Sequence, residues 1–210
     1  INMSRVGTSS AMTQAIHIGD GSTAIANIAG EIAFVGTNRT SAAGVVMYGA
    51  KGTVNISADI TGFIYGTFIQ NGANNTTEGL VINYFDGTTE NVYGAVFADN
   101  VTGATLNANN YTFRGTAVNV DEYFGVITAY DSSNNKLVFT NSVIENVYPE
   151  GTYSDLFLFN FRDTTGTVQI NTSTLTNNST NNLMVGYNGM DMDLFDVATV
   201  DDESTLNGYV

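Results

Sequence analysis

The sequence predicts an all-β protein whose short strands stack as a parallel β-solenoid of about six or seven coils. Three observations predict this fold. The 210-residue chain is rich in small polar residues and contains a single Pro and no Cys. Asn, Thr, Ser and Gly are poor helix formers that favour turns and strand edges. Short β-favouring runs recur along the chain, and residues of alternating polarity follow most of them.

The first repeated unit is an apolar run that ends near an aromatic residue and an Asp, Gly or Asn turn. Its copies are GVVMYGAKG (Gly44–Gly52), GLVINYFDG (Gly79–Gly87), GVITAYDSS (Gly125–Ser133), LFLFNFRDTTG (Leu156–Gly166), LMVGYNG (Leu183–Gly189) and, more weakly, AIHIGDG (Ala15–Gly21). We align the copies on one aromatic residue each, namely Tyr48, Tyr84, Tyr130, Phe161 and Tyr187. Each copy is expected to form a strand and a tight turn.

The second repeated unit follows the turn and alternates apolar with polar residues. Its copies are GTVNISADI (Gly52–Ile60), GATLNANNYTF (Gly103–Phe113), NKLVFTNSVI (Asn135–Ile144) and GTVQINTSTL (Gly166–Leu175). The pairs Val54/Ile56, Leu137/Phe139 and Val168/Ile170 have the period of a strand with one buried face. Each repeat therefore reads as strand, turn, strand, variable loop and strand.

A repeat of this length cannot bury its apolar face alone, so copies must stack on one another. We expect a core column of inward Val, Ile, Leu and Phe. Asn-rich segments such as NANN, SSNN and NNST suit the corners, because Asn tolerates the left-handed conformation. An antiparallel sandwich also has many short strands, but it does not predict the ordered recurrence. We expect one β-helix domain over residues 1–210, excised from a longer chain.

The charge of the chain argues against two classes of partner. Twenty acidic residues outweigh six basic ones, giving a net charge of −14. Binding to phosphates takes clustered Lys and Arg, whereas the basic residues here are scattered singly. No stretch approaches the ~20 apolar residues of a transmembrane helix. We therefore expect neither nucleic-acid binding nor membrane insertion.

Coil sequences such as TVNISADITG and TVQINTSTLTNNST, with few charges, no cysteine and an acidic balance, resemble the passenger domains of autotransporters, the type V secreted adhesins of Gram-negative bacteria. The resemblance covers the chain from about Ala15 to Leu206 and is one of style rather than of a diagnostic motif. It implies a right-handed parallel β-helix outside the cell, at the bacterial surface or secreted. It also implies a role in adhesion, self-association or host contact.

A catalytic interpretation finds little support in the sequence. The only histidine, His17, lies between Ile16 and Ile18, so on a strand it faces away from them. The chain has no Cys and no Gly-x-Ser-x-Gly motif. Glycoside hydrolysis needs a carboxylate pair, but the His-Gly and Arg-x-Lys motifs of the pectin hydrolases are missing. We expect that the chain is not an enzyme.

Acidic residues gather near the C-terminus, in DMDLFDVATVDDES (Asp191–Ser204). Calcium prefers six to eight oxygen ligands of this kind. The spacing fits neither an EF-hand nor the calcium-binding nonapeptide repeat, so a solvated acidic edge is the simpler interpretation and no cofactor is expected. The candidate ligands for a weak calcium site are Asp191, Asp193, Asp196, Asp201 and Asp202.

Two variable segments, NVDEYFG (Asn119–Gly125) and NVYPEGTYSD (Asn146–Asp155), combine aromatic with acidic residues at the same place in successive repeats. Stacked loops on one side of a solenoid form a continuous patch, although these aromatics could equally pack over the coil edges. The candidate binding residues are Glu122, Tyr123, Phe124, Tyr148, Glu150, Tyr153 and Asp155.

The sequence thus predicts a non-catalytic, secreted bacterial surface adhesin fragment. It would bind a host surface protein or glycan, or copies of itself, through the lateral face of a β-helix. Loop aromatics, strand edges or polar Asn/Thr ladders would make the contacts. Two alternatives stay open: a polysaccharide-binding or -cleaving β-helix of the tailspike or pectin-degrading type, and a structural spacer.

Overall fold

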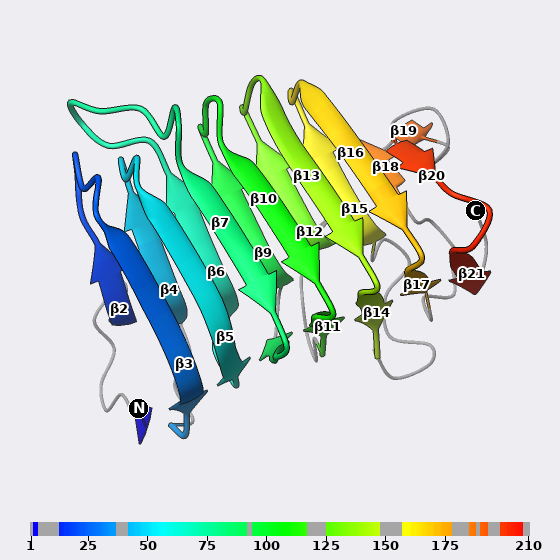
Figure 1. Cartoon of the computed structure of the whole chain (residues 1–210), viewed down its shortest axis with the longest axis horizontal. Coiled ribbons are helices and arrows are strands. Elements are labelled where there is room, and N and C mark those ends of the chain that lie inside the picture. The colour runs from blue at the N-terminus through cyan, green and yellow to red at the C-terminus, as the bar shows by residue number, and fades with distance from the viewer. Residues whose placement is uncertain are drawn as a thin grey trace.

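The structure, a computed structural model, describes residues 2–3, 13–36, 42–91, 94–116, 125–147, 157–177, 185–187, 190–192 and 198–207. Within these ranges all regular elements are β-strands. They stack as a β-solenoid of about five turns (Figure 1). The all-β class and the parallel stacking predicted from the sequence are confirmed. No helix in the described part of the chain is long and apolar enough to cross a membrane.

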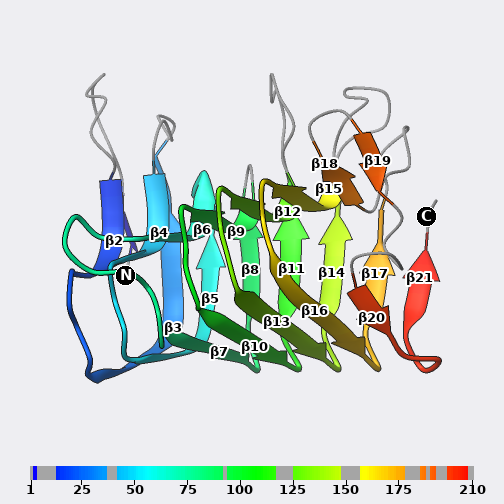
Figure 2. The same cartoon turned by 90° about the horizontal axis from the view of Figure 1, so that it is seen from above.

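Two sheets form the walls of the solenoid, and Figure 2 shows their strands following one another along its long axis. The 13-stranded sheet, called sheet A, contains β1 (Asn2–Met3), β3 (Ile25–Phe34), β5 (Thr53–Thr61), β7 (Val81–Phe85), β8 (Thr88–Asn91), β10 (Thr105–Asn109), β11 (Thr112–Gly115), β13 (Asn135–Thr140), β14 (Val143–Asn146), β16 (Gly166–Asn171), β17 (Thr174–Thr176), β20 (Ala198–Val200) and β21 (Thr205–Asn207). The 8-stranded sheet, called sheet B, contains β2 (Thr13–Ile18), β4 (Ala42–Tyr48), β6 (Tyr65–Gln70), β9 (Gly94–Asp99), β12 (Gly125–Tyr130), β15 (Phe157–Arg162), β18 (Val185–Tyr187) and β19 (Met190–Met192).

From β6 onward, one turn of the solenoid runs through one strand of sheet B and then through two consecutive strands of sheet A, as in β12, β13 and β14. In the first layers one long strand, β3 or β5, takes the place of those two, and β5 pairs with both β7 and β8. Each strand pairs in parallel with its equivalent in the next layer; Leu106, for example, pairs with Leu137, and Leu137 with Val168. The exception is β19, which pairs with β18 in the antiparallel sense. Successive layers are therefore joined by backbone hydrogen bonds between residues far apart in sequence.

The expected number of coils was too high. The first and last repeat units form the edges of the stack instead of full turns. At one end β2 pairs only with β4, and at the other end β18, β20 and β21 are three residues long. A terminal layer has a neighbour on one side only, so it buries less apolar surface than an inner layer.

The alignment on aromatic residues was wrong at Tyr84. This residue lies in β7 of sheet A, whereas Tyr48 and Tyr130 end strands of sheet B. The sheet B strand of that turn is β6, which precedes Tyr84 in the chain and ends at Gln70. The error arose because β7 has the same order of apolar run, aromatic residue and turn as the sheet B strands, although it continues the alternating pattern of β5.

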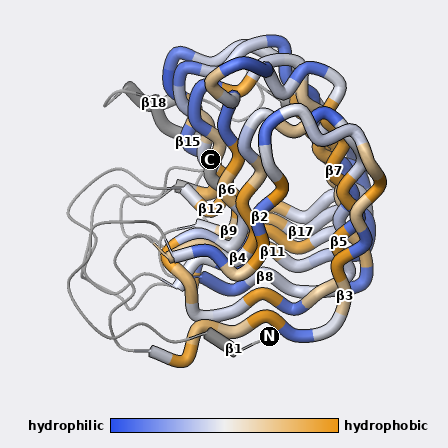
Figure 3. The backbone as a smooth tube through the Cα atoms, turned by 90° about the vertical axis from the view of Figure 1, so that its left-hand side faces the viewer, coloured by the Kyte–Doolittle hydropathy of each residue, from blue (hydrophilic) through white to orange (hydrophobic). Residues whose placement is uncertain are grey.

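The second repeated unit was predicted correctly. Its inward residues Val54, Ile56, Phe139 and Ile170 are buried, and their polar neighbours face outward. Figure 3, which looks along the long axis, shows the tube enclosing a core between the two sheets. Burial of this apolar column provides the main driving force for stacking.

Aromatic side chains continue the core from layer to layer. Tyr84 packs against Tyr111 and Phe113, with ring centroids 4.9 and 5.1 Å apart. Phe139 and Phe159 extend the series, at 5.7 Å from Phe113 and 5.9 Å from Phe139 respectively. These separations are typical of favourable aromatic pairs.

The corners use short polar residues, as the sequence predicted. Asn110 and Asn134, in the NANN and SSNN segments, both adopt positive φ (54° and 55°). Between the two strands of sheet A a serine recurs every 31 residues: the backbone N–H of Ser142 donates to Ser173 Oγ, and that of Ser173 donates to Ser204 Oγ, both at 3.1 Å. Each corner therefore satisfies a backbone donor of the layer before it.

Candidate binding face

Strands β3, β5, β7, β10, β13 and β16 lie side by side on one wall of the solenoid (Figure 1). Their alternate residues are buried, so the residues between them point to solvent. We call the outward residues of the three columns below the lateral face; Glu31 and Asp59, which follow on β3 and β5 toward the adjoining wall, are not part of it. Three columns run along it: Ile25, Thr53, Val81, Thr105, Lys136 and Thr167; Asn27, Asn55, Asn83, Asn107, Val138 and Gln169; and Ala29, Ser57, Phe85, Asn109, Thr140 and Asn171.

The middle column contains an asparagine ladder. Asn55 Nδ2 donates to Asn27 Oδ1 at 2.8 Å, Asn83 Nδ2 donates to Asn55 Oδ1 at 2.9 Å, and Asn107 Nδ2 donates to Asn83 Oδ1 at 3.0 Å. Because Asn55 and Asn83 each donate to one neighbour and accept from the other, the four side chains hold one another in a single orientation. The ladder ends where Asn107 meets Val138.

The lateral face carries almost no charge. Among its residues only Lys136 is charged, although the chain as a whole has a net charge of −14. The adjoining wall of sheet A is different. There Arg114 lies between Glu90 and Glu145 of the neighbouring layers, with N···O distances of 2.8 and 2.5 Å. The hydrogen bonds that Arg114 donates to Glu90 and Glu145 raise the pKa of Arg114.

Sequence reasoning named Asn/Thr ladders in general terms but did not identify Asn27, Asn55, Asn83 or Asn107. A signal was present, because each follows the first inward apolar residue of its strand. The intervals are 28, 28 and 24 residues. The unequal last interval hides the column unless the register between strands is known.

The loop residues predicted from the sequence, Glu122, Tyr123, Phe124, Tyr148, Glu150, Tyr153 and Asp155, lie outside the described residues. The strands that flank these two segments are described. β11 pairs in register with β14, and β12 pairs in register with β15. The two segments therefore leave and re-enter the solenoid at equivalent places in consecutive layers, while their role in binding stays a prediction.

The C-terminal acidic residues are only partly described. Asp193 and Asp196 lie outside the described residues, Asp191 is placed by its backbone in β19, and Asp202 is exposed in the turn after β20. The carboxylate of Asp201 accepts hydrogen bonds from the backbone N–H of Thr172, at 2.9 Å, and from Ser204 Oγ, at 2.6 Å.

These two hydrogen bonds lower the pKa of Asp201, with the bond from Ser204 having the larger effect. This carboxylate therefore caps a backbone donor of the preceding layer, as the corner serines do. The described part of the chain brings no three His, Cys, Asp or Glu residues together as a metal site. A weak calcium site that includes Asp193 and Asp196 stays a prediction.

His17 lies on β2 with its ring exposed, and its Nδ1 is 2.6 Å from Gln14 Oε1. It faces away from the partly buried Ile16 and Ile18, as the strand period predicted. The ring is thus paired with a neutral amide of its own strand. This pairing provides neither the carboxylate partner nor the nucleophile that a catalytic histidine uses.

The fold and this face define the chain as a β-solenoid with a polar, nearly uncharged lateral surface. Comparisons with protein-family models, with curated proteins and with solved structures give no match.

Proposed function

We propose that this chain is a non-catalytic adhesive segment of a secreted or surface-exposed bacterial protein, and that its lateral face makes the contacts. The partner is a host surface protein, a glycan or a second copy of the chain. The observation that carries the proposal is the lateral face itself, a regular polar surface with Lys136 as its one charge on a chain of net charge −14. The likeness of the coil sequences to autotransporter passengers supports the same function.

Charge explains why this face is the favoured contact surface. A strongly acidic molecule repels other acidic surfaces, including copies of itself and sialylated or sulfated host glycans. That repulsion is weakest where the approaching surface carries no carboxylates. The lateral face meets this condition, whereas the adjoining wall presents Glu90 and Glu145.

The geometry of the face also suits an extended partner. Strands in a sheet are about 4.8 Å apart, so each column repeats the same kind of donor and acceptor at that interval. Asparagine amides fixed in a ladder have already lost rotamer freedom, so a partner that binds them bears less ordering cost. Many weak contacts along the solenoid then add up through multivalency.

A pair of matched variants tests the proposal. The lateral-face variant is Thr53→Glu with Thr105→Glu, and the control is Thr112→Glu with Thr174→Glu on the adjoining wall. Both variants add two carboxylates at outward strand positions. Each protein is tested against a glycan and host-glycoprotein panel, with calcium and with EDTA, and for self-association by sedimentation velocity.

We expect the lateral-face variant to bind at least tenfold more weakly at low salt, with part of the loss recovered at high salt because salt screens surface charges. The control should bind like the unmodified chain. Equal losses in both variants would show that net charge alone matters. Binding by both variants at the unmodified level would place the contact surface elsewhere, and cleavage products from the panel would contradict the non-catalytic assignment.

A further inference from the structure

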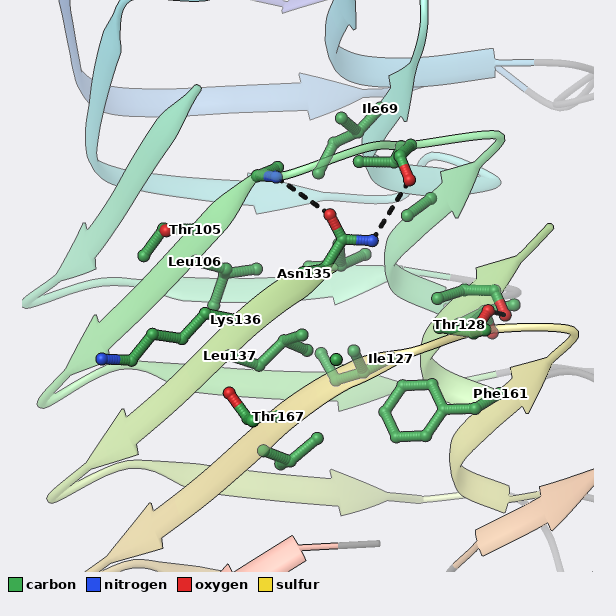
Figure 4. Close-up of a pocket in the computed structure, with 18 of the residues that line it drawn as sticks. Ile69, Thr105, Leu106, Ile127, Thr128, Asn135, Lys136, Leu137, Phe161 and Thr167 are labelled. Atoms are coloured by element: carbon green, nitrogen blue, oxygen red, sulfur yellow. Dashed lines mark hydrogen bonds between the residues drawn. The ribbon is translucent and has the colours of Figure 1, made fainter. Parts of the chain in front are cut away.

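The core is not filled evenly. Between the two sheets, in the layers from β6 to β16, lies a cavity of about 840 Å³ (Figure 4). It follows the corner where strands of sheet B end and strands of sheet A begin. Its volume falls within the roughly 300–1,000 Å³ range of small-molecule sites. Its walls are mainly aliphatic, with Phe161 and Ile127 on the side of sheet B and Leu106 and Leu137 on the side of sheet A.

The cavity exists because one core column changes from large to small side chains. Along sheet B, the inward residues in register are Met47, Ile69, Ala98, Ala129 and Phe161. The two alanines leave the middle layers without the bulk that Met47 and Ile69 supply in the first layers. Since close packing is the rule in protein interiors, two successive alanines opposite leucines open a void.

The exposed fractions of the core side chains agree with a void caused by the two small residues. In the first layers Met47, Val54 and Ile82 are 0%, 1% and 1% exposed. At equivalent positions around the cavity, Ala129 and Val168 are 6% and 7% exposed although layers lie on both sides of them. Water therefore reaches Ala129 and Val168, beside the small residues, but not their counterparts Met47, Val54 and Ile82.

The buried polar side chains that line the cavity, Asn135 and Thr128, are hydrogen-bonded to the backbone. Asn135 Oδ1 accepts from the backbone N–H of Ala104 at 2.9 Å, and its Nδ2 donates to the carbonyl of Val101 at 3.3 Å (Figure 4). Thr164 Oγ1 donates to the carbonyl of Ala129 at 3.0 Å. A sugar or a cluster of waters would find few free partners here, whereas an apolar molecule loses nothing by entering.

The corner after β15 gives access from solvent, because Asp163, Thr165 and Gly166 line the cavity and are exposed. Lys136 also contributes to the lining, but its side chain extends away from Phe161 and Ile127 (Figure 4). At the opening Arg162 Nε is paired with the carboxylate of Asp163 at 3.8 Å, so the net charge of −14 carried by the whole chain disfavours an anionic head at the outer end of the ligand.

We propose that this cavity binds an unbranched alkyl chain with an uncharged polar end. The lining of the cavity extends across the layers from Ile69 to Phe161, three steps of about 4.8 Å or about 14 Å in all. A medium-length alkyl chain fits this length and the narrow aliphatic walls. The site adjoins the lateral face, because Thr105, Lys136 and Thr167 belong to both, whereas Ala98 and Ala129 lie in the interior and can be changed without altering that face.

The test uses 1-decanol as the probe and measures its binding by ligand-observed NMR and by the rise in Tm that it causes. Ala129→Leu fills the middle of the cavity, and Ala29→Leu, on the exposed outer face of β3, is the control for added apolar surface. We expect the unmodified chain and Ala29→Leu to bind 1-decanol with equal affinity. Ala129→Leu should bind it at least tenfold more weakly and should have a higher Tm without the probe.

Ala98→Val is a second filling variant, one layer away, that adds less volume than Ala129→Leu. It distinguishes a cavity that accepts added side-chain volume from one site at which leucine alone is poorly tolerated. If both Ala129→Leu and Ala98→Val lower Tm, the interior has no free volume and the proposal is wrong. Failure of 1-decanol to bind the unmodified chain would also overturn it. Equally tight binding of decanoate would contradict the uncharged end, and binding of maltose would contradict the apolar class.

Discussion

The pKa of Asp99, in sheet B, depends on the surroundings of its side chain. Asp99 ends β9 and accepts a hydrogen bond from Gln70 Nε2 at 2.8 Å. Partial burial raises the pKa of Asp99, the charge of Asp131 raises it further, and the hydrogen bond from Gln70 opposes both. The folded chain therefore holds this proton more tightly than the unfolded chain does.

We expect Asp99→Asn to stabilise the protein at neutral pH. Since the pKa of Asp99 is raised in the folded state, its ionised form opposes folding above that pKa, and the penalty disappears below the unfolded value. Asparagine removes the charge and keeps an acceptor for Gln70. The free energy of unfolding should rise by less than about 1 kcal/mol at pH 7, because solvent screens a partly exposed group, and should be unchanged near pH 3. Thermal unfolding as a function of pH measures both.

Asp201→Asn is the matched control and has the opposite sign. The pKa of Asp201 is lowered by its hydrogen bonds, so its ionised form stabilises the fold above the unfolded pKa, and that stability is lost as the pH falls. This variant should lower Tm at pH 7 and have little effect in acid. Identical pH profiles for the two variants would mean that neither environment acts as described.

At the scale of single strands, the asparagine ladder should contribute to the free energy of unfolding. Asn83→Ala removes one hydrogen bond to Asn55 and one from Asn107. At about 0.5–1.5 kcal/mol for each of the two bonds, the free energy of unfolding should fall by about 1–3 kcal/mol. The control is Asn109→Ala, on the same face in the neighbouring column, where the side chain is exposed. Denaturant unfolding compares the two, and equal losses would contradict a cooperative ladder.

The two sheets differed in how well the sequence predicted them. The second repeated unit was recognised because Val168 and Ile170 alternate with polar residues, as expected where one face is buried and the other is wet. In sheet B the alternation is lost. Val45, Val46 and Met47 are all buried, so the sequence of β4 does not show which side of the strand faces the core. Tyr84 was misaligned for this reason, since the sheet B copies had only an aromatic end to define them.

The candidate binding face could be predicted in kind but not in detail. Polar columns were expected from the abundance of Asn and Thr, but which residues share a column depends on the register. The register depends in turn on loops of unequal length, such as residues 71–80 between β6 and β7, and the sequence does not fix their path. The cavity was not predicted, because the pairing of Ala98 with Ala129 appears only once the layers are aligned.

At the scale of the whole molecule, the aromatic series links the layers. Phe113 is fully buried and contacts Tyr84, Tyr111 and Phe139. Phe113→Ala should lower the free energy of unfolding by about 3–5 kcal/mol through lost burial and an unfilled space. Phe85→Ala, which removes an outward ring that is 37% exposed, should cost far less. Equilibrium unfolding tests this, and similar losses for both would show that the core is loosely packed.

The 31-residue spacing of the corner serines has a consequence for how the length of such a chain changes. A layer such as β13 with β14 contacts its two neighbours through the same register and the same corner hydrogen bonds. Gene duplication or deletion of one such unit would bring together two strands that already match, as β10 and β16 do in their apolar positions Leu106 and Val168. Evolution can therefore lengthen or shorten this solenoid in steps of one layer, about 4.8 Å each, without redesigning any other part.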